Sequence, residues 1–227
     1  MKTLLLWDID GTLTLSGGAG MQALQAALRQ EFGIDRPLDG IDYAGRTDTW
    51  ILRQIFGRIG LPDHPANLAR LLTRYLAELP VALRNPGTRI LPGVAAALAA
   101  LAAHGGCAQA LLTGNVERGA RIKLEHHGLS HFFAFGAFAD DSESRNDLGP
   151  VALRRAREQL GVEFALERVF VIGDTPHDIA CGKVIGAQTI AVATGQYSVE
   201  ALRAATPSAV LTDLSDTAAF LRLVGAM

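Results

Sequence analysis

Two carboxylates near the N-terminus are the side chains that could carry out chemistry most directly. Asp8 and Asp10 follow the apolar run of residues 4–7 and precede Gly11 and Thr12. An uninterrupted apolar run predicts a strand buried on both faces, and parallel sheets bind ligands beyond the carboxyl ends of their strands. Because Gly11 lets the backbone turn at once, both acids can face one pocket, where their repulsion favours a divalent cation or a shared proton. A plain strand-ending turn is the alternative, and the pairing of the acids argues against it.

A second apolar run ends in the same way further along the chain. Residues 169–172 lead into Gly173, Asp174 and, four residues later, Asp178. Carboxylates at this spacing can hold a magnesium ion through oxygen ligands and bound water. The alternative is a capped helix start with Asp178 on an exposed face, which the pair of acids near the N-terminus argues against.

A helix start follows a third apolar run, residues 108–112. Thr113, Gly114 and Asn115 stand between that run and the helical pattern. A hydroxyl and unpaired backbone N–H groups at the first turn of a helix form an anion site suited to phosphate. Thr113 or Asn115 could instead simply cap the helix.

Strand-like and helix-like patterns alternate from residue 90 onward. This alternation predicts an α/β fold, a Rossmann-like parallel sheet with right-handed crossovers and helices on both faces. The patterns predict strands at 108–112, 132–138, 168–172, 189–192 and, at the sheet edge, 209–211, and helices at 94–101, 116–127, 151–160, 179–184 and 198–204.

Residues 15–85 differ, because only helical patterns occur there. Asn67 is the expected N-cap of the last helix in this segment, and Pro80 is expected beyond its end. The sequence therefore predicts a core of residues 1–14 and 86–227, with a small all-helical domain inserted after the first strand. Apolar spacing predicts no strand from residue 15 to 83 and three helices, at about 21–32, 50–59 and 68–79.

Composition narrows the class of protein. The chain has 227 residues, a formal net charge of -2 and 49% hydrophobic residues, a globular composition without a basic surface for nucleic acid or anionic membranes. No apolar stretch reaches the ~20 residues of a membrane span, and the N-terminus lacks a signal-peptide pattern, so a cytoplasmic protein is expected. Cys107 and Cys181 show no metal-ligand spacing and are expected to be reduced and buried, with a disulfide between them as the alternative.

The first acidic segment, residues 8–13 (DIDGTL), resembles the first motif of the haloacid dehalogenase superfamily, most of whose members are magnesium-dependent phosphatases. Thr113 matches the phosphate-binding Ser or Thr of the second motif, and residues 173–178 match the Gly-Asp-x-x-x-Asp pattern of the fourth. The resemblance covers the whole chain in order. It implies the superfamily's α/β core with the helical insertion as a C1-type cap, nearest to phosphoglycolate phosphatase-like members.

The third motif departs from the superfamily pattern, which has a lysine that neutralises the nucleophile and the phosphate. In the corresponding segment, residues 140–150, the only cation is Arg145, and a guanidinium can bridge a carboxylate and a phosphate bidentately. We therefore expect Arg145 to take this role. Lys123 and Lys183 are the other candidates, although Lys123 is expected to face the surface from the helix after the second motif, and Lys183 to lie on the helix after the fourth.

The resemblance also implies a role for each residue of the site. Asp8 is the expected nucleophile, and Asp10 is the expected acid and base for the leaving oxygen and the water, with its proton affinity raised by its neighbours. Mg²⁺ is expected on Asp8, the Asp10 carbonyl, Asp174 and Asp178. The phosphoryl oxygens are expected to meet donors on Gly11, Thr113, Gly114, Asn115 and Arg145.

One segment of the expected cap is the candidate for recognising the substrate. Residues 45–48 place a cation, Arg46, and a hydroxyl, Thr47, between two helices, and a cap arginine suits a substrate carboxylate. The alternative is a helix N-terminus capped by Thr47 or Asp48, with Arg46 on the surface.

These features predict a magnesium-dependent phosphatase that hydrolyses a small phosphorylated metabolite resembling 2-phosphoglycolate through an aspartyl-phosphate. The protein is expected to act as a monomer or homodimer, without nucleic-acid or membrane partners. In the superfamily, an Asp two residues after the nucleophile separates phosphatases and mutases from dehalogenases. The alternatives are a sugar phosphomutase of the β-phosphoglucomutase kind, for which the cap offers no definite sugar-binding set, and a catalytically silent binding module, which only the altered third motif supports.

Overall fold

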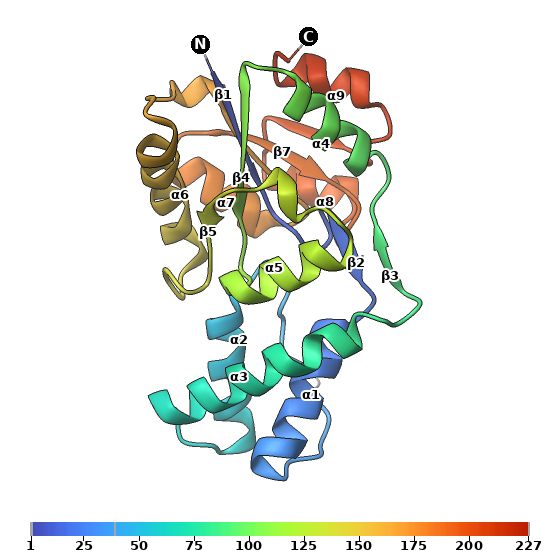
Figure 1. The fold of residues 1–227 in the computed structure, drawn as a ribbon, viewed down its shortest axis with the longest axis vertical. Coiled ribbons are helices and arrows are strands. Elements are labelled where there is room, and N and C mark those ends of the chain that lie inside the picture. Colours follow the sequence, from blue (N-terminus) through green and yellow to red (C-terminus); the bar gives the residue numbers. More distant parts are fainter. Residues whose placement is uncertain (1, 39, 227) are drawn as a thin grey trace.

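The computed structural model describes residues 2–38 and 40–226. A parallel six-stranded sheet with the strand order β5-β4-β1-β6-β7-β8 lies at its centre (Figure 1). Its strands alternate along the chain with helices, so the predicted α/β fold is confirmed. The strands are β1 (Thr3–Trp7), β4 (Cys107–Leu112), β5 (Gly136–Ala137), β6 (Val169–Gly173), β7 (Gln188–Val192) and β8 (Ala209–Leu211).

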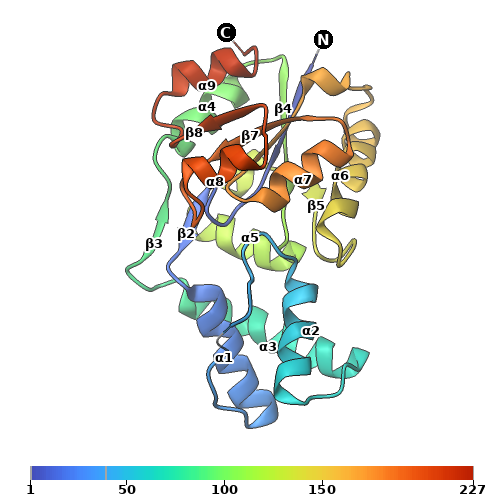
Figure 2. The ribbon, with the colours of Figure 1, turned by 180° about the vertical axis from the view of Figure 1, so that it is seen from behind.

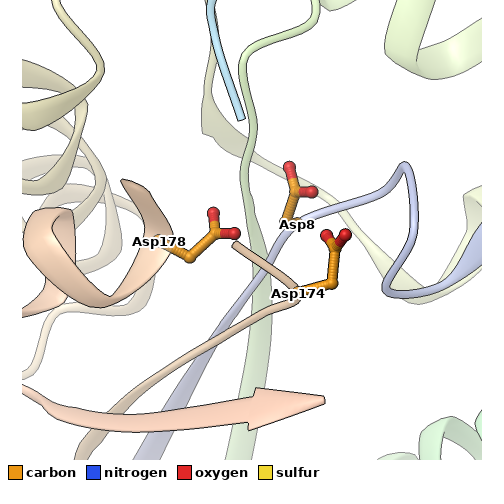
Figure 3. A group of neighbouring side chains, drawn as sticks. All are labelled: Asp8, Asp174 and Asp178. Carbon is orange, nitrogen blue, oxygen red and sulfur yellow. The ribbon is translucent and has the colours of Figure 1, made fainter. Parts of the chain in front are cut away.

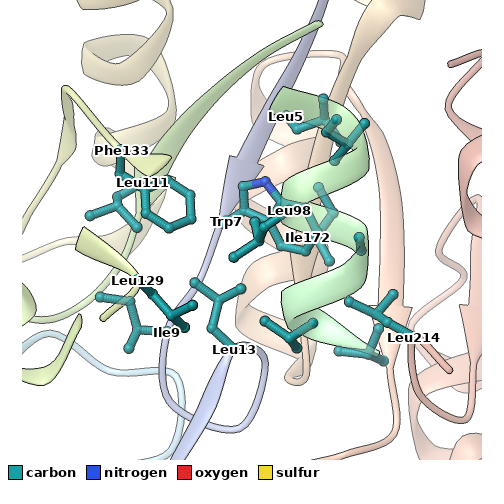
Figure 4. Packing of buried hydrophobic residues seen from close by; sticks show 14 of the residues in the cluster. Leu5, Trp7, Ile9, Leu13, Leu98, Leu111, Leu129, Phe133, Ile172 and Leu214 are labelled. Atoms are coloured by element: carbon teal, nitrogen blue, oxygen red, sulfur yellow. The ribbon is translucent and has the colours of Figure 1, made fainter. Parts of the chain in front are cut away.

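Helices cover both faces of this sheet: α4 (Val94–Ala103), α5 (Glu117–His126), α6 (Arg145–Leu160), α7 (Pro176–Val184), α8 (Val199–Ala204) and α9 (Thr217–Leu223). Successive side chains of a strand point to opposite faces. Leu5 and Trp7 of β1 therefore pack on one side, in a cluster with residues of α4, α5 and α9 (Figure 4). Leu4 and Leu6 pack on the other side with α6 and α7. The first strand is buried on both faces, as its apolar run predicts.

Three further helices form a separate layer beyond the carboxyl ends of the strands (Figures 1 and 2): α1 (Ala19–Phe32), α2 (Asp48–Ile59) and α3 (Pro65–Ala82). Their buried side chains form a cluster of their own, which includes Leu28, Leu52, Phe56 and Leu71. This layer therefore has an apolar core apart from the two clusters of the sheet. In the described part of the chain, no helix combines the length and apolar character of a membrane span.

A two-stranded ribbon joins the helical layer to the sheet. β2 (Thr14–Ser16) pairs antiparallel with β3 (Thr88–Ile90), and the side-chain amide of Asn85 donates to the carbonyl of Ser16 at 3.0 Å. The prediction of no strand from residue 15 onward was therefore wrong at its first two residues. Strands of three residues are too short to show the alternation by which a strand is recognised.

Two element boundaries outside the site also differ from prediction. α3 begins after His64, which caps it, rather than at Asn67, and Pro80 lies within its last turn. The strand predicted over residues 132–138 is reduced to the two residues of β5. The aromatic side chains of that segment fill the core instead, since Phe133, Phe135 and Phe138 are all buried.

The start of α6 is the boundary that matters for the site. The sequence predicts a start at residue 151, directly after Pro150. The helix instead begins at Arg145 and contains Pro150. Arg145 is thereby the first residue of a helix rather than part of a loop.

Candidate active site

Three carboxylates meet where neighbouring strands of the sheet end. Asp8 follows β1 and Asp174 follows β6, which pairs with β1 in parallel, while Asp178 lies in the first turn of α7. One oxygen of each acid lies within 4.8 Å of the others, and all three residues are buried (Figure 3). We call these residues the three-acid cluster. The structure thus brings together the acids that were expected to bind a metal through their side chains.

The start of α7 fixes Asp178 in place. Thr175 Oγ1 accepts the backbone N–H of Asp178 at 3.3 Å, and Asp178 Oδ2 accepts the backbone N–H of Thr175 at 3.0 Å and its hydroxyl at 2.8 Å. This capping box occupies Oδ2 and leaves Oδ1 for the cluster. Because Asp178 is 2% exposed, it does not lie on an exposed helix face.

A guanidinium lies among the three acids. Arg145 Nη2 donates to Oδ1 of Asp8 at 2.9 Å and to Oδ1 of Asp178, and it approaches the carbonyl of Leu112 at 3.4 Å. The residue is 8% exposed. The structure therefore places Arg145 beside the expected nucleophile. Lys183 instead donates to groups of the segment that follows α8.

The three-acid cluster carries more negative charge than Arg145 balances. Burial, opposed by Arg145 and reinforced by Asp178, raises the pKa of Asp8 to about 6. Burial also raises the pKa of Asp174 well above its usual range, although the Thr12 hydroxyl donates to its Oδ1 at 3.2 Å. A bound divalent cation would remove this excess charge, and carboxylate oxygens are ligands that Mg²⁺ accepts.

The backbone around Asp174 leaves no room for larger residues. A side chain added at Gly11 or Gly195 would overlap the Asp174 carboxylate. Gly11 also has φ +83, a conformation that favours glycine, and its carbonyl accepts the Thr194 hydroxyl at 2.5 Å. The donor set, its burial and this close backbone fit a site for a divalent cation.

Asp10 is held apart from the three-acid cluster. Lys123 Nζ donates to Oδ2 of Asp10 at 2.5 Å, and Asn115 Nδ2 donates to the same oxygen at 2.8 Å. Lys123 Nζ also donates to Oδ1 of Asn115 at 2.6 Å, which closes a triangle of contacts. We call Asp10, Asn115 and Lys123 the Asp10 triad.

The prediction that Lys123 faces the surface was wrong, because the residue is 5% exposed. The buried residues of α5 are Gly119, Ala120, Lys123 and Leu124. Positions three and four apart share one face of a helix. A lysine in line with two small residues and a leucine was the signal in the sequence that indicated the buried face.

The charge state of Asp10 also differs from expectation. Burial raises the pKa of Asp10. The ammonium of Lys123 and the hydrogen bonds from Lys123 and Asn115 lower this pKa by more than burial raises it, so that it lies below its usual value. Burial lowers the pKa of Lys123, but Asp10 and Asp48 raise it to above its usual value. The expectation that neighbours raise the proton affinity of Asp10 was wrong for this conformation, in which the pair is ionised.

The segment after β4 orients one member of the triad and does not cap α5, whose N-cap residue is Val116. Thr113 is fully buried, and its Oγ1 accepts the backbone N–H of Asn115 at 3.3 Å and the side-chain amide at 2.9 Å. Gly114 lies against the helical layer, because its carbonyl accepts the backbone N–H of Asp48 at 2.7 Å. The Asn115 side chain is thus directed to Asp10.

Thr47 and Arg46 have different surroundings. Thr47 caps α2 by accepting the N–H of Trp50 at 3.2 Å, and its hydroxyl donates to the carbonyl of Glu143 at 2.7 Å. The helix-cap alternative therefore holds for Thr47, which is 1% exposed. Arg46 instead lines the cavity at the site, with its guanidinium carbon 4.6 Å from the centroid of the Trp50 ring.

A cavity of about 420 Å³ lies between the helical layer and the sheet. Asp8, Asp10 and Asp174 line it from the sheet side. This size suits a small-molecule site, since such pockets commonly measure about 300–1,000 Å³. The helical layer contributes a largely apolar wall that includes Met21, Leu24, Ile51 and Tyr75.

Asp48 connects the helical layer to the sheet by a hydrogen bond, and it should make the stability of the folded protein depend on pH. Its Oδ2 accepts the N–H of Val116 at 2.8 Å, and burial raises its pKa to about 6 despite Lys123. A raised folded-state pKa gives a stabilising contribution that is complete below about pH 4 and is lost as the pH rises through about 6. Asp48→Asn cannot ionise but keeps an acceptor for Val116. Its melting temperature relative to wild type should therefore be higher at about pH 8 than at about pH 4.

Melting curves of both proteins across this pH range test the expectation. A difference between Asp48→Asn and wild type that stays constant from about pH 4 to about pH 8 would contradict the assignment.

Known proteins resemble this chain over nearly its whole length. Residues 2–186 match the family model described as haloacid dehalogenase-like hydrolase. The chain is 29% identical over 222 residues to "Probable phosphatase IndB" of Dickeya dadantii (strain 3937), covering 95% of this chain and 92% of the relative. It is 26% identical over 234 residues to phosphoglycolate phosphatase of Escherichia coli O157:H7, covering 92% and 88%. The crystal structure of CbbY from Rhodobacter sphaeroides in complex with phosphate has the same fold, with a TM-score of 0.76 at 18% identity over 95% of this chain and 96% of the other.

Proposed function

The chain belongs to the haloacid dehalogenase-like hydrolase family, and we propose that it is a magnesium-dependent phosphatase of small phosphate monoesters. The observation that carries this proposal is the division of the acids in one cavity. Asp8 lies in the three-acid cluster beside Arg145, whereas Asp10 is held apart by Lys123. Phosphate transfer through a covalent intermediate needs such a nucleophile and a separate acid for the leaving oxygen. The phosphatase names of two relatives support the same activity.

The proposed reaction has two steps. An oxygen of Asp8 attacks phosphorus in line with the ester oxygen, the bond between phosphorus and that oxygen breaks, and its electron pair leaves with the ester oxygen, which takes a proton from Asp10. In the second step, Asp10 takes a proton from water while the water oxygen attacks phosphorus. The bond between phosphorus and Asp8 then breaks, which restores the Asp8 carboxylate and releases orthophosphate.

The first step requires a proton on Asp10, which is ionised in the described conformation. A bound phosphate monoester adds negative charge beside Asp10, and a nearby like charge favours the protonated form of an acid. Substrate binding should therefore raise the pKa of Asp10 and favour its protonated form.

Other groups of the site would bind the substrate and the cofactor. Mg²⁺, held by the three-acid cluster and the Asp10 carbonyl, would act as a Lewis acid toward the phosphoryl oxygens. Arg145 and the turns at Gly11 and at residues 113–115 would bind the same oxygens. Helices α1–α3, as a cap of residues 15–85, would exclude water from the cavity.

For the leaving group, we propose a small carboxylate-bearing alcohol, as in 2-phosphoglycolate. Arg46 lines the cavity from the cap side, and a guanidinium pairs well with a carboxylate. The name of the Escherichia coli relative supports this choice. The proposal includes action in the cytoplasm on a soluble metabolite.

The test is release of phosphate from a panel of monoesters that includes 2-phosphoglycolate, with Mg²⁺ and after treatment with EDTA. We expect release only with Mg²⁺. Release that survives EDTA would contradict metal dependence, and a folded protein that releases no phosphate from any ester would contradict the proposed function.

Removal of one expected metal ligand should abolish the stabilisation that Mg²⁺ provides. Binding at a concentration one hundred times the dissociation constant stabilises a folded protein by about 2.7 kcal/mol. Asp174→Asn should remove most of the rise in melting temperature on addition of Mg²⁺. Asp63→Asn, at an exposed ion pair with Arg53, is the control and should keep it. An undiminished rise in Asp174→Asn would place the ion elsewhere.

A further inference from the structure

Asp10 owes its position to Lys123, and the proposed function does not yet give that lysine a role. Both Lys123 and Asn115 donate to Oδ2 of Asp10, at 2.5 and 2.8 Å. We propose that Lys123 is a positioning residue that holds Asp10 for proton transfer to the leaving oxygen and from the attacking water. This inference rests on the proposed function, because it assigns Lys123 to one step of that reaction.

The two buried cations of the site contact different acids. Among the described residues, the hydrogen bonds of Lys123 go to Asp10 and Asn115, while the acids bonded to Arg145 are Asp8 and Asp178. Arg145 already neutralises the expected nucleophile. Lys123 therefore acts within the Asp10 triad and not on the three-acid cluster.

The exposure of the pair indicates how the contact works. The Lys123 side chain is 6% exposed and the Asp10 side chain is 38% exposed, and both residues line the cavity. The carboxylate therefore presents more of its surface to the substrate space than the lysine does. Because both donors of the triad bind Oδ2, they fix the orientation of the carboxylate.

Packing alone does not account for a lysine here. A buried ammonium loses its hydration, and this loss is offset only by close pairing with charged or polar groups. An uncharged side chain of similar length, such as methionine, would fill the same space without that loss. Asn115 is likewise fully engaged within the site, because its side-chain NH₂ group donates to Asp10 and Thr113 while its side-chain oxygen accepts from Lys123.

The proposal predicts an effect that depends on the leaving group. An alkyl alcohol departs only if its oxygen receives a proton, whereas 2,4-dinitrophenolate departs as a stable anion. A general acid matters for the first kind of ester and little for the second. Misplacing Asp10 should therefore slow the release of alkyl alcohols selectively.

The experiment compares Lys123→Met with wild type in single turnovers, with protein in excess over substrate and Mg²⁺ present. The substrates are 2,4-dinitrophenyl phosphate and the alkyl ester of the panel that wild type hydrolyses fastest. Because general acid catalysis contributes about 10²–10⁴-fold, we expect Lys123→Met to release the alkyl alcohol at least about 100-fold more slowly and dinitrophenolate less than about threefold more slowly. The rise in melting temperature with Mg²⁺ should stay unchanged, since the three-acid cluster is intact.

Two further variants complete the design. Lys183→Met removes a lysine that lies outside the site and should leave both rates unchanged. Asn115→Ala removes the second donor to Asp10 and should show the same selectivity to a smaller degree, which keeps the test valid if Lys123→Met does not fold.

The possible results separate this role from the proposed function. If folded Lys123→Met or Asn115→Ala released both leaving groups equally slowly, or as fast as wild type, the role of Lys123 would be overturned. The proposed phosphatase activity would be unaffected. Failure of wild type to release either leaving group would contradict the proposed function and this role with it.

Discussion

Asp8→Asn is expected to lower the rate of magnesium-dependent phosphate release by about 10⁴-fold or more, because it replaces the carboxylate that attacks phosphorus by an amide. An amide is a poor nucleophile of nearly the same shape. Folding should survive the change, since Arg145 keeps its contact with Asp178 and one of three crowded carboxylates loses its charge. Steady-state phosphate release, with circular dichroism to verify the fold, measures the effect.

The control for this variant is Asp35→Asn. Asp35 forms an exposed ion pair with Arg29 at 2.7 Å, far from the cavity in the chain's helical layer, and its replacement should leave the rate unchanged. If Asp8→Asn kept a rate within about tenfold of wild type, an effect too small for loss of a nucleophile, Asp8 would not be the attacking residue.

Among the variants proposed for this protein, Arg145→Met is expected to lower the free energy of unfolding most. The guanidinium is 8% exposed and bonds to two buried acids, Asp8 and Asp178. Removing one partner of a buried ionic contact costs about 3–5 kcal/mol, because the remaining charges are left unpaired. Urea unfolding in EDTA should show this loss, and added Mg²⁺ should recover part of it, because the ion can balance the same carboxylates.

A matched control lies on the same helix. Arg154 forms an exposed pair with Glu158 at 3.2 Å, and exposed pairs of this spacing contribute only about 0.3–0.5 kcal/mol. Arg154→Met should therefore change the free energy of unfolding very little. Equal effects of the two variants would show that Arg145 is not needed to balance the three-acid cluster.

The parts of the site that follow apolar strands could be predicted from the sequence. Asp8 and Asp174 each closely follow a run of residues that predicts a buried strand, and parallel strands bring such positions together at one edge. The resemblance to known motifs points to the same residues. Local sequence and topology therefore decide where these acids lie.

The contacts of Lys123 could not be predicted in the same way. Its partners, Asp10 and Asn115, lie 113 and 8 residues away in sequence, and a lysine on a helix is ordinarily exposed. The start of α6 was missed for a different reason, because Pro150 favours a first turn and thus hid the five helical residues before it. In both cases, packing overrode a local preference.

The position of β1 in the sheet has a consequence for the order of events during synthesis. β1 pairs with β4, where Thr3 lies opposite Cys107, and with β6, where Leu4 lies opposite Val169. The strand that precedes Asp8 thus leaves the ribosome before the other strands of this sheet, but it has no partner strand until more than a hundred further residues have been made. Long separations of this kind slow folding, and exposed apolar segments promote aggregation until they are covered. The apolar cluster of helices α1–α3 is largely built from neighbouring stretches of chain. These helices can therefore pack before β4 and β6, the partner strands of β1, have been made.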